Sequence, residues 1–426
     1  MTALTRQNKK EINPLISFLP VVICFLILWQ FFWFDNSHLR FSPYVFWPVV
    51  AFISLVSLLS SNFLKNAKTY LKIIAFSFIW CLISVLFTPS KYDGVLFLAE
   101  LLLYFFACAF VVNKKIDYIK IVYVLCFLHM VLLLSQRFLP SIFYTFVGLI
   151  SGPSTVSILQ HNANSGIYYG FTGQTSTISF YLIVGLIISL YNITKNKKID
   201  FKYIVLAFIF GLSILLTNRR GALIFSLALI LLFLLMDRRK LAIKLVIIAM
   251  IVFVVLAIGM NNIPGVKEII NKFEVYNERN DLLSGRTAFW NYCIEMFESK
   301  PVFGAGFNSF TNYSDFEVNT AHNSYIQKLG EMGIVGTIVF FLPHLYTFGL
   351  SILLYFSRKT DFKTKKYMLL MILFQSFFFM EAVFEGFYET PIFYVFIFLI
   401  EMSIISHKQS NVKRMSLNES YSVYSR

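Results

Sequence analysis

Long apolar runs, separated by short charged clusters, divide this chain of 426 residues almost from end to end. Each run has about twenty residues, the length that a helix needs to cross the ~30 Å hydrocarbon core of a membrane. The composition agrees, because 58% of the residues are hydrophobic and only 14% are charged. Soluble domains usually have about 25% charged residues. We therefore expect an all-α integral membrane protein.

Twelve of these runs are predicted to be transmembrane helices. They are centred on residues 14–34, 42–61, 70–88, 95–113, 119–137, 175–193, 203–218, 221–236, 242–262, 333–356, 367–385 and 391–407. Every second connection is basic, and these segments hold 26 of the 37 Lys and Arg residues: 1–13, 62–72, 114–120, 195–202, 237–244, 357–366 and 407–426. Basic residues are retained on the cytoplasmic side, so both termini are predicted to be cytoplasmic. This asymmetry accounts for most of the net charge of +15, and nucleic-acid binding is not expected.

The predicted spans divide the chain into four regions. These are 1–262, with nine spans, an outer loop at 138–174 and an arginine turn at 217–222; 263–332, a large outer loop; 333–407, with three spans; and 408–426, a cytoplasmic tail. No internal repeat is visible. The five cysteines have no metal or disulfide spacing and are interpreted as small packing residues. No His/Asp/Glu cluster has the spacing of metal ligands, so neither a catalytic metal nor a cofactor is expected.

The outer loop at 263–332 has 70 residues, and loops of that length usually carry function or are disordered. It contains apolar residues at helical spacing: Phe289, Trp290, Cys293, Ile294 and Phe297. We expect Ser284 to cap this helix, with Arg286 in its first turn. A second helix is predicted to start near His322 and to continue into the tenth span. Amphipathic helices of this kind lie on membrane surfaces, where a lipid-linked substrate would be within reach.

An arginine pair interrupts the apolar stretch 203–236 in the sequence Thr217-Asn218-Arg219-Arg220-Gly221. As one helix this stretch would measure about 51 Å, well beyond the membrane thickness. Because both of its ends are basic, we expect the chain to cross, turn at the arginines and return. The turn would place two guanidinium groups at the outer surface, where their planar forks suit a diphosphate. The alternative is that both arginines mark the turn and reach toward lipid phosphates.

Arg286 and His322 are the remaining candidates of the outer loop. A cation in the first turn of a helix is slightly unfavourable, which suggests an anionic partner for Arg286; an exposed arginine without a function is the alternative. His322 is the only histidine of this loop. Helix N-terminal amides favour a neutral imidazole, which could accept the proton of a sugar hydroxyl. The alternative is a histidine that hydrogen-bonds to a loop carbonyl.

Carboxylates near the predicted spans suggest a second class of protein. They are Glu100, Glu381, Glu385 and Glu401. Ionisable groups inside a membrane often mark a transport path. Twelve spans with both termini inside are also a common transporter plan. However, three of the four carboxylates fall near outer helix ends, where water is close, and the halves of the chain are unequal.

Several motifs together resemble the core of the O-antigen ligase/polymerase superfamily. In chain order they are Arg-Arg-Gly-Ala at 219–222, Ser-Gly-Arg-Thr-Ala-Phe-Trp at 284–290, Pro-Val-Phe-Gly-Ala-Gly-Phe-Asn at 301–308, Ala-His-Asn-Ser-Tyr at 321–325 and Glu-Met-Gly-Ile-Val-Gly at 331–336. This core covers residues 217–336, and the many spans with one large outer loop extend the likeness to the whole chain. The resemblance implies a membrane-embedded glycosyltransferase of the GT-C type.

The resemblance also implies roles for individual residues. His322 would activate the acceptor hydroxyl, while Arg220 and Arg286 would hold the diphosphate of the donor. A small polar residue often precedes the motif arginine in this family, but here that residue is Arg219. We therefore assign the key role to Arg220 and treat Arg219 as auxiliary. The substrate-binding residues expected in this way are Arg220, Arg286, Arg219, Asn323 and Tyr325.

Within this family we expect a polymerase of undecaprenyl-diphosphate-linked repeat units of O-antigen or capsular polysaccharide. Its site would face outward from the bacterial cytoplasmic membrane, and attack in line with the leaving diphosphate would invert the anomeric centre. The first alternative is a ligase that transfers the finished glycan to a lipid A core or another acceptor. The second is a polysaccharide flippase or other transporter. Besides the lipid-linked donor, the glycan acceptor and membrane lipids, a flippase and a chain-length regulator are candidate partners.

Overall fold

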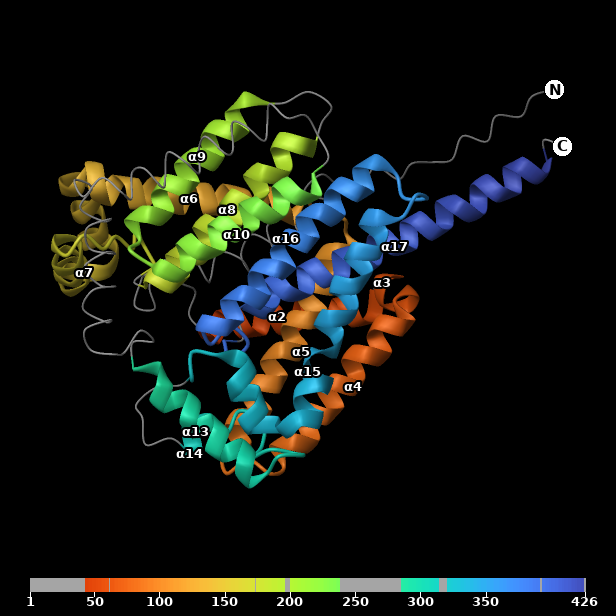
Figure 1. Ribbon diagram of the computed structural model, residues 1–426, viewed down its shortest axis with the longest axis horizontal. Helices are drawn as coiled ribbons and strands as arrows, with labels where there is room; N and C mark the ends of the chain where they lie inside the picture. Colours follow the sequence, from red (N-terminus) through yellow and green to blue (C-terminus); the bar gives the residue numbers. More distant parts are fainter. Residues whose placement is uncertain are drawn as a thin grey trace.

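The computed structural model describes residues 43–60, 62–172, 174–195, 200–237, 285–313, 320–390 and 393–424, and no strand occurs among them. Their helices are α2 (Pro43–Ser60), α3 (Asn62–Asn66), α4 (Lys68–Val85), α5 (Lys91–Asn113), α6 (Tyr118–Phe138), α7 (Pro140–Asn164), α8 (Thr175–Lys195), α9 (Phe201–Leu216), α10 (Arg220–Met236), α13 (Arg286–Ser299), α14 (Phe310–Tyr313), α15 (Ser324–Phe356), α16 (Phe362–Phe384) and α17 (Phe393–Tyr424) (Figure 1). The expected all-α fold is confirmed for these residues.

The apolar runs have become helices that agree with a membrane protein. Seven described helices are long and apolar enough to cross a membrane, namely α4, α5, α6, α7, α8, α15 and α16. Ten predicted spans fall on described residues, and each coincides with a helix. The other two, at 14–34 and 242–262, lie outside the described residues. The count of twelve spans, the cytoplasmic termini and the GT-C assignment stay predictions.

Helix α7 lies in the segment expected to be an outer loop, residues 138–174. It is interrupted at Gly152, whose φ of 82° and ψ of 171° are not helical, and Pro153 follows directly. Each half has roughly a dozen residues and so measures about 18 Å. Neither half alone is long enough to cross a ~30 Å hydrocarbon core.

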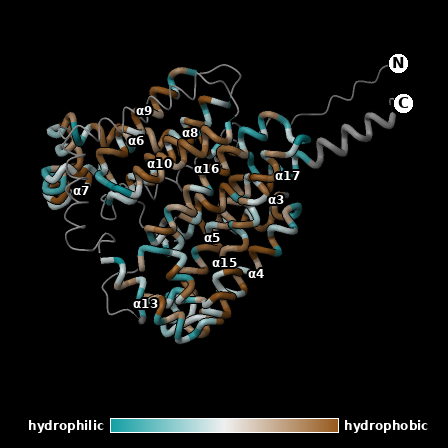
Figure 2. Tube along the Cα trace, in the orientation of Figure 1, coloured by the Kyte–Doolittle hydropathy of each residue, from teal (hydrophilic) through white to brown (hydrophobic). Residues whose placement is uncertain are grey.

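The interior of the helical bundle is built around α8, which is buried along nearly its whole length. Phe180 of α8 packs against aromatic rings of neighbouring elements, with ring centroids 5.4 Å from Phe377 of α16 and 4.9 Å from Phe393 of α17. Figure 2 shows hydrophobic residues along the interior helices, while α13 carries many hydrophilic ones. Apolar side chains also point outward, among them Phe76, Ile79 and Leu82 of α4. Such exposed apolar faces suit contact with lipid tails.

The segment that precedes α15 is fixed to a break within that helix. Gly333 interrupts α15 with a φ of 64°, and a Cβ there would lie 2.4 Å from the carbonyl carbon of Val302. The segment that follows α13 docks at this break, because Gly306 N–H donates to the carbonyl of Glu331 at 2.7 Å and Ile334 N–H donates to that of Pro301 at 2.9 Å. The glycine-containing turn at 304–308 therefore shapes the loop. Figure 1 shows α13 and α14 together at this end of the molecule.

Candidate functional site

The predicted arginine turn joins α9 to α10. Helix α9 ends at Leu216, and the Thr217 hydroxyl donates to the carbonyl of Ile214 at 2.7 Å. Asn218 has a positive φ of 53°, a left-handed conformation that Asn tolerates better than most residues. Arg219 then takes an extended conformation, and Arg220 is the first residue of α10. The chain turns where the sequence predicted, between two apolar helices.

Arg219 is held by two carboxylates of α16 and its end. One terminal nitrogen lies 2.8 Å from Oε1 of Glu381, and the other lies 2.8 Å from Oε1 of Glu385. The side chain is only 11% exposed, so this is a buried, charge-assisted contact. Both terminal nitrogens are engaged, and the guanidinium joins the start of α10 to the end of α16. Arg220 is half-buried beside it.

Arg286 approaches the same carboxylate from the start of α13. It begins α13 directly after Gly285, which has a left-handed φ of 78° and forms the N-cap without a side-chain hydrogen bond. The cap was expected from Ser284, which lies outside the described residues. One terminal nitrogen of Arg286 lies 3.3 Å from Oε1 of Glu385, and the other donates to the carbonyl of Phe384. The predicted anionic partner of Arg286 is a carboxylate of the protein itself.

His322 is the third group at this point. It has a left-handed φ of 52° and lies two residues before the start of α15. Its Nδ1 is 3.3 Å from Oε2 of Glu385, and its side chain is 34% exposed. Trp290 of α13 holds the preceding residue, because its indole N–H donates to the carbonyl of Ala321 at 3.0 Å. With Nδ1 facing a carboxylate, the tautomer that carries its proton on Nδ1 can donate to Glu385 and accept at Nε2.

Glu385 therefore joins three cations or potential cations that are distant in sequence. It lies just past the end of α16, where it caps the helix C-terminus. Burial raises the pKa of its carboxyl, but the hydrogen bond from His322 and the charges of Arg219 and Arg286 outweigh burial and lower the pKa to about 2. The carboxylate stays ionised at any physiological pH. It forms a fixed negative centre that orients the three groups.

The other two predicted substrate-binding residues have structural contacts. The Asn323 side chain caps α15 by accepting from the backbone N–H groups of Tyr325 and Ile326, each at 3.1 Å. The Tyr325 hydroxyl donates to the carbonyl of Phe379 at 3.1 Å. These contacts fix the first turn of α15 against α16. A direct role of Asn323 or Tyr325 in substrate binding stays a prediction.

A buried cluster of charged residues, which follows His322 in the sequence, holds the first turns of α15 in place. Lys328 is 2.7 Å from Oε2 of Glu331 and 3.5 Å from Oε1 of Glu389. The Ser324 hydroxyl donates to the other oxygen of Glu389 at 2.6 Å. Glu331 also accepts from the backbone N–H of Phe310 at 3.3 Å. Because all of these groups are buried, each needs its partner, and the cluster links α15 to the segments beside it.

Glu385 and this lysine cluster are the residues that sequence reasoning missed. Glu381 and Glu385 were weighed only as marks of a transport path. Their spacing of four residues at the end of a predicted span places both on one helix face, which was the available signal. No spacing rule pairs them with arginines that lie more than 90 residues away. In the part of the chain that the structure describes, no group of three or more His, Cys, Asp or Glu could hold a metal ion.

A family model described as O-antigen ligase matches residues 204–341. This match supports the O-antigen ligase/polymerase superfamily. It confirms the resemblance that the sequence motifs indicated. The matched segment is about a third of the chain and runs from α9 into α15, so it includes both arginines of the turn, Arg286 and His322. No curated protein matches the chain.

The O-antigen ligase/polymerase superfamily implies glycosyltransferase-like activity on lipid-linked glycans by a multi-pass membrane protein. The described helices agree with that setting. The matched segment ends before Glu381 and Glu385, which lie in α16 and directly after it. Glu381 and Glu385, which bind the arginines and the histidine, thus lie in a part of the chain that the family model does not match.

Proposed function

We propose that this protein is a membrane glycosyltransferase that polymerises undecaprenyl-diphosphate-linked repeat units of O-antigen or capsular polysaccharide. The observation that carries the proposal is the convergence of Arg219, Arg286 and His322 on Glu385. These side chains come from three segments that are far apart in the sequence. A structure that brings two guanidiniums and an imidazole to one carboxylate at a helix end is suited to an anionic substrate with a reacting hydroxyl.

In the proposed reaction, the acceptor hydroxyl oxygen attacks the anomeric carbon of the donor sugar. The bond between that carbon and the diphosphate oxygen breaks, and the lipid diphosphate leaves with the electron pair. The hydroxyl proton passes to Nε2 of His322 as the new glycosidic bond forms. Attack from the side opposite the leaving group inverts the anomeric centre.

The three arginines would have different roles, either in positioning other groups or in binding the diphosphate. Both terminal nitrogens of Arg219 bind carboxylates, which suits a positioning role for this residue. Arg286 is 26% exposed and contacts Glu385 at the longer distance of 3.3 Å, so it can turn donors toward a phosphate. Arg220 lies next to Arg219 at the start of α10, and we assign it to the diphosphate with Arg286. Cations held in place before the reaction stabilise the charge that develops on the leaving group.

Two other functions compete with polymerisation. The matching family is described as O-antigen ligase, which favours a ligase that would transfer the glycan to a lipid A core or another acceptor by the same chemistry. A flippase would move the lipid-linked glycan without forming a bond. For a flippase, Glu381 and Glu385 would have to exchange partners during transport, yet both are bound to Arg219 at 2.8 Å.

Reconstitution separates these functions. The purified full-length protein would be placed in vesicles with an undecaprenyl-diphosphate-linked repeat unit, and the products would be resolved on a gel. A ladder of longer lipid-linked glycans supports the polymerase. Transfer only to added lipid A core or protein identifies a ligase, and movement across the bilayer without new bonds identifies a flippase. Either of the last two results would refute the proposed polymerase.

A further inference from the structure

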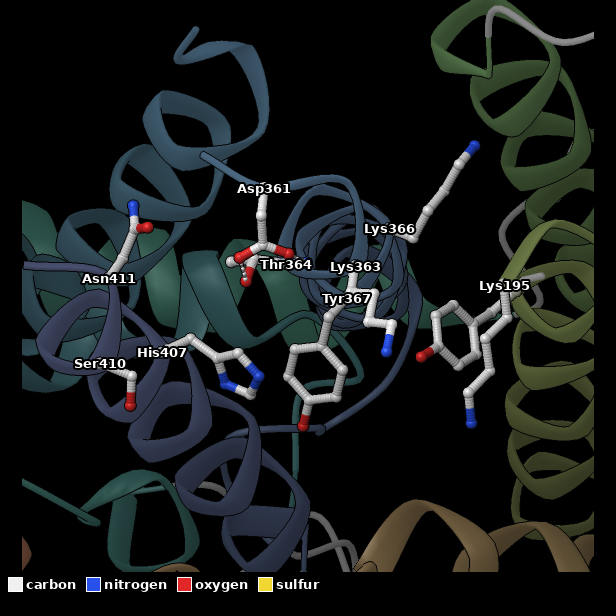
Figure 3. Close-up of a pocket in the computed structure, with 10 residues that line it drawn as sticks. Lys195, Asp361, Lys363, Thr364, Lys366, Tyr367, His407, Ser410 and Asn411 are labelled. Carbon is white, nitrogen blue, oxygen red and sulfur yellow. Dashed lines mark hydrogen bonds between the residues drawn. The ribbon is translucent and has the colours of Figure 1, made fainter. Parts of the chain in front are cut away.

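A cavity of about 470 Å³ lies between the C-terminal end of α8, the N-terminal end of α16 and the middle of α17 (Figure 3). It is at the opposite end of α16 from Glu385. Helix α16 has 23 residues and so measures about 34 Å, close to the thickness of a membrane. Lys195, Lys363 and His407 of its lining belong to basic connections that the sequence predicts to be cytoplasmic. The residues used below are Tyr191, Lys195, Asp361, Lys363, Tyr367 and His407.

Two exposed lysines give this cavity its charge. Lys195 ends α8 and Lys363 lies in the first turn of α16. Among the described residues, no carboxylate lies within ion-pair distance of either ammonium group. In Figure 3 both side chains extend into the same part of the cavity, whereas Lys366 is directed away from them. Lys366 forms an ion pair with Asp237, at the end of α10.

Asp361, the acidic residue of the cavity lining, does not cancel this charge. Asp361 caps α16, because its two carboxylate oxygens accept from the backbone N–H and the hydroxyl of Thr364 at 3.0 and 2.8 Å. The lining contains three lysines and one aspartate, and one of the lysines, Lys366, is paired with Asp237. These groups together therefore leave an excess of positive charge. An anion can therefore bind beside Lys195 and Lys363 without displacing a protein carboxylate.

Aromatic side chains form the walls. The His407 ring stacks on the Tyr367 ring with centroids 4.2 Å apart, and the Tyr191 ring packs edge-on against Tyr367 at 6.5 Å. The ammonium of Lys195 lies 5.6 Å from the Tyr191 ring centroid. Tyrosines are enriched at the depth of lipid headgroups, because one end of the side chain is apolar and the other is polar. A cavity with lysines at its mouth and tyrosines in its wall matches the transition from headgroup to acyl chain.

We propose that this cavity binds the phosphate group of an anionic phospholipid, with Lys195 and Lys363 as its ligands. Anionic lipids are concentrated in the cytoplasmic leaflet, and basic pockets between transmembrane helices bind their headgroups. The volume suits a glycerophosphate headgroup, because small-molecule sites typically measure about 300–1,000 Å³. A soluble phosphate offers the same chemistry without the lipid tails. This site is independent of the proposed glycosyl transfer.

The test is native mass spectrometry of the full-length protein in detergent. The protein would be titrated separately with phosphatidylglycerol, with zwitterionic phosphatidylethanolamine and with inorganic phosphate. We expect phosphatidylglycerol to be retained preferentially. Each lysine near an anionic headgroup contributes roughly a factor of five to binding, so the double variant Lys195→Ala/Lys363→Ala should retain this lipid about 25-fold more weakly. Both lysines are exposed, and their replacement should leave the fold intact.

The matched control is Lys65→Ala/Lys72→Ala, which removes two exposed lysines from another segment predicted to be cytoplasmic. This control should retain phosphatidylglycerol like the wild type. Binding of inorganic phosphate that depends on Lys195 and Lys363, without a lipid preference, would overturn the assignment to a phospholipid and identify a soluble anion as the ligand. Equal retention of the two lipids, or equal losses in both double variants, would overturn the proposal.

Discussion

Replacing Glu385 with glutamine is the most direct test of the site. The substitution keeps the size of the side chain but removes the charge that Arg219, Arg286 and His322 share. It also turns an acceptor into a group that can donate. A donor facing Nδ1 of His322 favours the tautomer whose proton is on Nε2. That tautomer cannot accept the proton of a sugar hydroxyl at Nε2.

The expected loss of rate follows from the geometry. Positioned acid–base groups typically contribute 10²–10⁴-fold to a rate. The His322 side chain is 34% exposed and its contact with Glu385 is 3.3 Å, so water competes for the ring. We therefore expect a decrease in kcat near the lower limit, about 10²-fold, or ~2.7 kcal/mol in activation free energy.

The same substitution should lower stability with a defined pH dependence. The pKa of the Glu385 carboxyl is about 2 in the folded protein, against an ordinary value of 4.5. A lowered pKa stabilises the fold above the ordinary value, and this contribution is lost as the pH falls through 2. At neutral pH it amounts to at most ~3 kcal/mol. Glu385→Gln should therefore lower the melting temperature at pH 7 and reduce the difference in melting temperature between pH 7 and pH 3.

Single-turnover transfer with saturating lipid-linked donor measures the chemical step apart from binding. The matched control is Glu298→Gln, which neutralises an exposed carboxylate of α13 and should leave rate and melting temperature unchanged. Glu385→Asp keeps the charge with a shorter reach and should recover part of the rate. A rate for Glu385→Gln within twofold of the wild type, in a folded protein, would refute the role of this carboxylate in orienting His322.

His322→Ala should lower single-turnover transfer by at least about 10²-fold while donor lipid still binds in a filter assay, since only the proton acceptor is lost. Arg286→Ala should weaken donor binding and turnover together by roughly tenfold or more, with partial recovery in Arg286→Lys. Arg219→Ala should lower the melting temperature, because unpairing buried carboxylates costs about 3–5 kcal/mol, whereas Arg220→Ala should lower turnover at nearly unchanged melting temperature; the opposite pattern would exchange their roles. Gly333→Ala should destabilise the fold, as seen in thermal melting, because a Cβ would meet the backbone at 2.4 Å where φ is 64°.

The helices and the turn between α9 and α10 could be predicted from local properties of the sequence. Apolar runs of membrane length have few other ways to satisfy their backbone hydrogen bonds, so each described run became a helix. The arginine pair had to lie at a helix end because a charge at mid-membrane is costly. The interruptions at Gly152 and Gly333 were not predicted. At Gly333 the positive φ goes with the close approach of the Val302 backbone, whereas a Cβ at Gly152 would meet nothing within 4 Å.

The candidate site also has a part that the sequence predicted and a part that only the packing of the helices decided. Residue chemistry and motif order pointed to the arginines and to His322, because these types are suited to a diphosphate and to proton transfer. Spacing could not show that Arg219 binds both carboxylates. It also could not show that Glu385 is the common partner of the arginines and His322. Arg219 and Glu385 are 166 positions apart. Their contact exists only because α10 packs against α16, and the packing of whole helices depends on the shape of all their side chains together.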